Sequence, residues 1–289
     1  MRVTNRSIFE SIKYNLGNIS EQLNKATEIS STGKRINSLS DDPVGLTQSL
    51  SIQSSLANIA QMQRNIDYGQ SWLSASESAL TNVNNILSNT KALCVQMASG
   101  NTNSDQRSAA AETVQNNLDE MISLANTNVA GNYIFSGTKT DTEPFDPDGA
   151  YTGDHNPFTI KISKNAGIEI GGDGQAVFGT VFDTLADLKT ALQTNDVSGI
   201  QDAMGKVDTH MNDISGKISD IGSKSARMDI KKNIFQDLNL SNTERLSNIE
   251  DADMAEAIMN LSAAQLTYQA ALASSSKVMS LSLVDYLTT

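Results

Sequence analysis

The stretch SSTGKRINSLSDDPVGL, residues Ser30 to Leu46, interrupts a chain whose residues follow helical spacing on both sides. Gly33 suits the C′ position that ends a helix, because glycine adopts the left-handed backbone conformation without steric cost. Asp42 followed by Pro43 is typical of an N-cap and the first residue of a helix. The stretch therefore predicts a non-helical joint between two helices, formed by Gly33, Lys34, Arg35, Asp41, Asp42 and Pro43.

The residues before and after this joint predict two helices that pack along apolar seams. Upstream, apolar residues recur at alternating steps of four and three, at Ile12, Leu16, Ile19 and Leu23. Downstream, an apolar residue recurs at every seventh position, at Ile52, Ile59, Ile66, Leu73, Leu80, Leu87 and Cys94. Because a helix rises by about 1.5 Å per residue, this second helix is too long for a compact domain. It predicts an elongated bundle.

The period of the pattern changes in the middle of the chain. A turn cluster over residues 99–107, with an N-cap at Ser104 or Asp105, leads into a third helix that reaches residue 125. The segments YIFSGT (133–138), FTIKI (158–162) and GIEI (167–170) then alternate as strands do. Helical spacing returns with a short helix over residues 182–192, a heptad series over 200–235 and a last helix over 254–286.

These elements predict a mainly α fold. We expect an elongated, antiparallel, coiled-coil-like bundle of long helices, formed by the N- and C-terminal halves, with a small β-rich domain inserted in mid-chain. Residues 1–40 and 250–289 are expected to form terminal assembly helices. Residues 41–132 and 182–249 are expected to form the long-helix bundle, and residues 133–181 the β-rich outer domain.

Composition limits the classes of partner. The 289 residues carry a formal net charge of −12, which disfavours nucleic acid and anionic membrane surfaces, because both bind basic faces. The sequence has no run of about 18 apolar residues that would span a membrane. Its N-terminal segment also lacks the apolar region of a Sec signal peptide. We therefore expect neither nucleic acid nor a membrane as a partner.

Residues that could support catalysis or bind a metal are sparse. His155 and His210 lie outside any zinc-binding pattern, and Cys94 occupies a seam position that predicts a buried, inert thiol. GGDGQAV (171–177) lacks the third glycine of a dinucleotide-binding loop, and DPDG (146–149) lacks the spacing of a calcium loop. Both predict turns, and we expect no enzyme activity, cofactor or metal site.

Two long motifs carry a resemblance to a known family. STGKRINSLSDDPVG (31–45) resembles the N-terminal motif of the bacterial flagellin superfamily, and residues 250–287 resemble its C-terminal helix. Pro43, together with GNYIFSGTKTDTEPF (131–145) and YTGD (151–154), is similar to the FlgL-type, hook–filament junction branch of that superfamily. The likeness spans both termini and the start of the predicted insert.

The resemblance implies a structural protein of the bacterial flagellum. Such a protein is exported unfolded through the flagellar type III channel and assembles outside the cell at the hook–filament junction. The implied partners are a FlgK-type hook-associated protein, flagellin, further copies of the chain in a ring, and an FlgN-type export chaperone. A short flagellin that forms the filament itself is the alternative, although the insert is short for a variable outer domain. An enzyme carried in the insert, or a coiled-coil protein unrelated to flagella, fits the motifs less well.

Two sets of residues are expected to carry this function. The terminal stripes are expected to pack against each other, against neighbouring subunits and against the chaperone; they are Ile12, Leu16, Ile19 and Leu23 in the first helix, and Ile258, Leu261, Tyr268 and Leu272 in the last. At the joint, Lys34 and Arg35 are expected to reach Asp41 or Asp42, or a neighbouring subunit. A solvated turn is the alternative for these charges.

Overall fold

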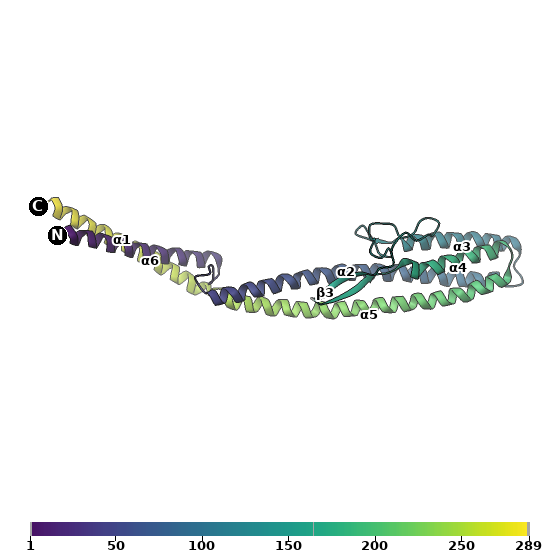
Figure 1. Cartoon of the computed structure of the whole chain (residues 1–289). Helices are drawn as coiled ribbons and strands as arrows, with labels where there is room; N and C mark the ends of the chain where they lie inside the picture. Colours follow the sequence, from purple (N-terminus) through teal and green to yellow (C-terminus); the bar gives the residue numbers. More distant parts are fainter. Residues whose placement is uncertain (1, 164, 288–289) are drawn as a thin grey trace. The chain divides into compact units, whose positions relative to one another are not determined.

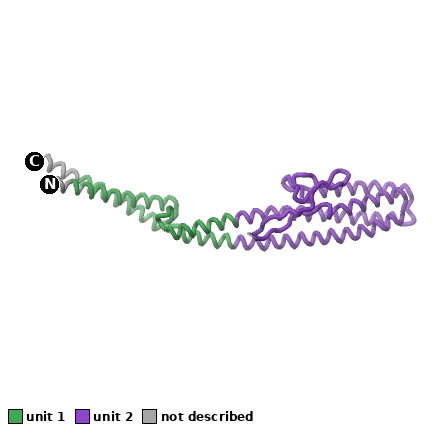
Figure 2. Tube along the Cα trace, in the orientation of Figure 1, with its two compact units in different colours: residues 1–58, 238–289 green, residues 59–237 purple. Residues whose placement is uncertain are grey.

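The computed structural model describes residues 2–163 and 165–287, and these residues form two compact units. Unit 1 contains the residues up to Asn58 and those from Leu238 onward, and unit 2 contains residues 59–237 (Figure 2). Residues 1, 164, 288 and 289, which are expected in the terminal helices and the β-rich domain, lie outside the described part. The predicted division into three parts stays a prediction.

Unit 1 is built on two terminal helices that pack against each other, α1 (Arg2–Thr32) and α6 (Met254–Leu287). It also contains the beginning of α2 (Pro43–Met97) and the end of α5 (Val197–Glu250). Gly33 ends α1 with a φ of +68°, and its N–H donates to the carbonyl of Ile29 at 2.9 Å. Asp42 caps α2, because its Oδ1 accepts from the N–H of Gly45 at 2.8 Å. The joint therefore begins and ends where the sequence predicts.

Unit 2 combines the remaining parts of α2 and α5, which run antiparallel (Figure 1), with α3 (Ser104–Ala125) and α4 (Thr180–Gln193). Helix α3 packs against α4. The predicted N-cap of α3, at Ser104 or Asp105, is wrong by a residue. Asn103 accepts from the N–H of Gln106, whose side chain accepts in return from the N–H of Asn103, and this closes a capping box.

The β-rich part of unit 2 consists of two small antiparallel sheets. One pairs β1 (Asn128–Val129) with β2 (Asn132–Tyr133), and the other pairs β3 (Phe158–Ser163) with β4 (Ala166–Gly171). A short π-helix, η1 (Gln175–Gly179), precedes α4. The β3–β4 pair was predicted, but the strand predicted over 133–138 ends at Tyr133. There the Ser136 hydroxyl donates to the carbonyl of Tyr133 at 3.1 Å, and Gly137 has a φ of +69°, so the segment turns.

The core of unit 2 joins the helices to the β-rich part. The seam residues Ile66, Leu73, Leu80, Leu87 and Cys94 are all buried, as the heptad pattern predicts. The β3–β4 hairpin lies against α2 at Gly69, where an added Cβ would come within 2.3 Å of Ile160. An aromatic cluster of Phe135, Phe145, Phe178 and Phe182 continues this core. The mainly α bundle with a mid-chain β-rich part is thereby confirmed.

Two further observations on the described residues concern membrane-spanning helices and metal-binding clusters. In residues 2–163 and 165–287, the structure has no helix that is long and apolar enough to cross a membrane. Across the same ranges, no group of three or more His, Cys, Asp or Glu side chains is placed to hold a metal ion.

Candidate functional site: the joint of unit 1

The joint is tied to the C-terminal half of the chain by its backbone. Residues 33–35 run antiparallel to residues 250–252, with Lys34 opposite Asp251. The N–H of Arg35 donates to the carbonyl of Glu250 at 2.6 Å, and the N–H of Ala252 donates to the carbonyl of Gly33 at 2.9 Å. The segment between α1 and α2 is therefore held against the segment between α5 and α6.

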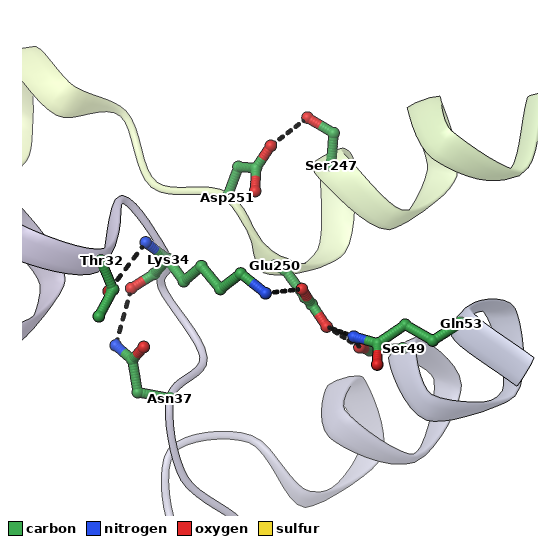
Figure 3. Close-up of polar contacts among 8 residues, drawn as sticks. All are labelled: Thr32, Lys34, Asn37, Ser49, Gln53, Ser247, Glu250 and Asp251. Atoms are coloured by element: carbon green, nitrogen blue, oxygen red, sulfur yellow. Dashed lines mark hydrogen bonds and ion pairs between the residues drawn. The ribbon is translucent and has the colours of Figure 1, made fainter. Parts of the chain in front are cut away.

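A buried carboxylate lies beside this backbone ladder. Glu250, the last residue of α5, is 4 % exposed. Its two oxygens accept from Lys34 Nζ at 2.7 Å and from Gln53 Nε2 at 2.7 Å, and the Ser49 hydroxyl also donates to it (Figure 3). A carboxylate this well buried is tolerated only when its lone pairs are satisfied and a cation is near. We call the ladder and these side chains the clasp: Gly33, Lys34, Arg35, Ser49, Gln53, Glu250 and Ala252.

The two joint cations have different partners. Arg35 donates to the carbonyl of Ile249 at 2.9 Å and lies 3.8 Å from a carboxylate oxygen of Asp42. The first contact places a cation at the C-terminal end of α5, where the helix dipole favours it. Arg35 thus reaches Asp42, as expected from the sequence. Lys34 reaches neither Asp41 nor Asp42, because its ammonium group pairs with Glu250.

Asp41 organises the other end of the joint. Its carboxylate lies 2.8 Å from Lys25 Nζ and accepts from the N–H groups of Asn37 and Ser38 at 3.2 and 3.0 Å. The hydrogen bond from Lys25, followed by those from the Ser38 and Asn37 backbone, holds the pKa of Asp41 well below its usual range. The charges of the joint are therefore paired within the chain, and the joint is a folded segment.

The stripe on α1 lies on one face of that helix, whereas the stripe predicted on α6 is divided between two faces. Ile12, Leu16, Ile19 and Leu23 are half-buried on α1, the helix that packs against α6. On α6, Ala257 is buried and Leu261, Ala264, Tyr268 and Ala271 are half-buried, again at alternating steps of four and three. Ile258 is 53 % exposed and Leu272 is 44 % exposed. The structure thus brings six of the eight stripe residues to the α1–α6 interface and leaves Ile258 and Leu272 outside it.

Five residues of this site were not predicted from the sequence: Lys25, Ser49, Gln53, Glu250 and Ala252. An antiparallel return of the chain brings the end of α5 near the joint, but a periodic pattern alone does not set the register. Ser49 and Gln53 are polar residues on a helix with an apolar seam, and such residues usually face solvent. Nothing in their local sequence distinguishes them from other surface positions.

Known proteins resemble the chain along most of its length. The family model of the bacterial flagellin N-terminal helical region matches residues 4–140, and that of the C-terminal helical region matches residues 204–287. Flagellar hook-associated protein 3 of Salmonella typhimurium is 24 % identical over 93 % of this chain and 95 % of the relative. Polar flagellin F of Vibrio parahaemolyticus is 32 % identical over 54 % of this chain and 41 % of the relative.

A solved structure shows the same relationship. The FlgL of Bacillus cereus superposes with a TM-score of 0.62 at 27 % identity, over 68 % of this chain and 99 % of that one. The two flagellin models cover both halves that meet at the clasp, and the hook-associated relatives match nearly end to end. The chain therefore belongs to the bacterial flagellin superfamily, on its FlgL branch of hook-associated proteins.

Proposed function

We propose that the chain is a structural subunit of the bacterial flagellum that joins the hook to the filament. In this proposal it follows a FlgK-type hook-associated protein at the hook tip, forms a ring with further copies of itself and receives the first flagellin subunits. The observation that carries the proposal is the pattern of coverage. The likeness to hook-associated protein 3 extends over 95 % of that relative, whereas the likeness to polar flagellin F extends over 41 % of it.

The terminal helices of unit 1 supply the surface for assembly. Helices α1 and α6 bury one stripe against each other, while apolar side chains remain on the outer face of α6, at Ile258, Met259, Leu266 and Leu272. Exposed apolar side chains on one helix are suited to burial against another helix. We propose that neighbouring subunits cover these side chains in the ring, and that an FlgN-type chaperone covers them before type III export.

The same proposal places the protein outside the cell. The chain is a component of the bacterial flagellum, and we propose that it reaches its position by secretion through the flagellar export channel. No step of this role requires bond-making chemistry. The alternative role is that of a short flagellin, which would place copies of the chain along the whole filament.

Electron microscopy of a strain that lacks this chain tests the proposal. We expect hooks that carry no filaments, with unpolymerised flagellin in the culture medium. If the medium instead contains no flagellin, the filament itself has been removed and the chain is a flagellin. If filaments form normally, the chain has neither role.

Immunogold labelling of intact flagella is the companion measurement. Antibodies raised against unit 2 should label one narrow zone at the base of each filament. Label along the filament would support the flagellin alternative, and absence of label from flagella would contradict both.

A further inference from the structure

The side chains that bond the carboxylate of Glu250 come from the other half of the chain. Among the described residues, the side chains bonded to its carboxylate are Lys34, Ser49 and Gln53, which belong to the joint and to α2. They are separated from Glu250 by 216, 201 and 197 residues. The carboxylate therefore connects the N-terminal and C-terminal parts of unit 1, and it contributes little to the local structure of α5.

The clasp is favourable only when it is complete. With Lys34 displaced, Glu250 would be a buried charge without a counter-ion. With residues 250–252 displaced, the buried Ser49 hydroxyl would lose its acceptor, and the N–H of Arg35 would lose the carbonyl of Glu250. The exposed Gln53 would keep only its hydrogen bond to Ser49. A buried polar group without a hydrogen-bond partner costs free energy. Arrangements in which only part of the clasp is formed are therefore disfavoured relative to the fully closed and fully open ones.

The backbone ladder has the same reciprocal form. One of its hydrogen bonds is donated by the N-terminal half, through Arg35, and the other by the C-terminal half, through Ala252. Lys34 and Asp251 form the non-hydrogen-bonded pair between them, which is the antiparallel arrangement in which two segments approach most closely. Neither segment can leave without breaking a bond that the other donates.

We propose that the clasp makes the docking of the two ends of the chain interdependent. The segment after α1 stays in place only while the segment before α6 does, and the reverse holds equally. A partner that takes hold of α6 and draws residues 250–252 away would thereby release the joint between α1 and α2. This inference rests on unit 1 alone and does not depend on the flagellar role.

Amide hydrogen exchange of the full-length chain tests the coupling at the two ladder donors. Glu250→Gln removes the charge from the C-terminal half with little change of shape, and Lys34→Met removes the cation from the N-terminal half. We expect each variant to accelerate exchange of both the Arg35 and the Ala252 amides, by roughly tenfold or more, because opening exposes the two together. The reciprocal response is what a purely local effect would not produce.

Asp251→Asn is the matched control, because it removes a neighbouring exposed charge whose side chain bonds Ser247 in its own turn. It should leave both amides at their original rates. The fluorescence of Trp72, the single tryptophan of the chain, reports whether unit 2 remains folded in every variant. The proposal is overturned if either substitution affects only the amide of its own segment, if Asp251→Asn acts equally, or if both amides are unprotected in the unaltered chain.

Discussion

The Nζ atom of Lys232 in α5 lies 2.7 Å from the Oδ1 atom of Asp67 in α2. This ion pair marks the register in which these two long helices meet in unit 2. Gln70, three residues further along α2, bonds Asp229, three residues back along α5. Lys91 and Asp208 continue the same register. Exposed pairs of this kind contribute little free energy, so the apolar seam must supply most of the stability.

Truncation of the seam should therefore be costly. Leu80 is 2 % exposed at the middle of the heptad series, and Leu80→Ala should lower the free energy of unfolding of unit 2 by about 2–5 kcal/mol, through lost burial and a residual cavity. Urea denaturation, monitored by the fluorescence of Trp72, measures this free energy. Val95→Ala on the exposed face of the same helix is the control, with an expected change below about 0.5 kcal/mol. A Leu80 effect as small as that of Val95 would mean that the seam is misassigned.

Arg107 should stabilise one end of unit 2 through its hydrogen bonds. Its buried guanidinium donates to the carbonyls of Met97 and Ser99, to the Thr102 hydroxyl and to the Asn195 side chain. Arg107→Met keeps the aliphatic stem but removes these four hydrogen bonds, and should lower the free energy of unfolding by about 1–3 kcal/mol in the same fluorescence assay.

Arg64→Met provides the matched comparison for Arg107, because Arg64 is exposed on α2 and bonds only Gln61 of its own helix among the described contacts. We expect a change within about 0.5 kcal/mol. Equal effects of the two substitutions would show that the acceptors around Arg107 find water instead.

The single thiol should report the integrity of the seam and respond to pH. Burial raises the pKa of Cys94 to about 11, above the value of about 8.5 for a free thiol. The native thiol thus keeps a proton that the unfolded thiol loses. Its contribution to stability is complete below about pH 8.5 and declines as the pH rises towards 11.

Two measurements check this prediction. At pH 8, iodoacetamide should alkylate Cys94 at least about 100-fold more slowly in the folded chain than in urea, since the reactive thiolate requires opening of unit 2. Cys94→Ala should also lessen the loss of stability between pH 8.5 and 11. Rapid alkylation of the folded chain would contradict the burial of this residue.

Two neighbouring residues of α6 should separate the folding of unit 1 from assembly. Leu261→Asp places a carboxylate in the α1–α6 interface and should destabilise that packing by about 1–3 kcal/mol, seen as faster amide exchange over residues 12–23. Ile258 lies on the exposed face of α6, so Ile258→Asp should leave the amide exchange of residues 12–23 unchanged.

In a strain that lacks the chain, neither variant should restore filaments, but for different reasons. Leu261→Asp fails through the structure of unit 1, and Ile258→Asp through the surface that neighbouring subunits cover. Restoration of normal filaments by Ile258→Asp would contradict an assembly role for the outer face of α6.

The helix ends at the joint, the buried seam and the family resemblance could all be predicted from the sequence alone, because the signals involved are local. Gly33 ends α1 and Asp42–Pro43 begin α2 through contacts that span three or four residues, so their types at those positions suffice. The burial of Leu73, Leu80 and Cys94 follows from a seven-residue repeat in the same way. The family resemblance rests on motifs that are themselves contiguous.

The tertiary structure alone decided which distant groups meet. Lys34 is followed by two acids within eight residues, yet it pairs with Glu250, because the register of the returning helix places that carboxylate beside it and buries it. The packing of α6 against α1 likewise half-buries Leu261 and leaves Ile258 exposed, although both residues fit an apolar stripe. A repeat of apolar residues defines a seam on each helix, but the position at which two seams meet depends on contacts between residues far apart in the chain.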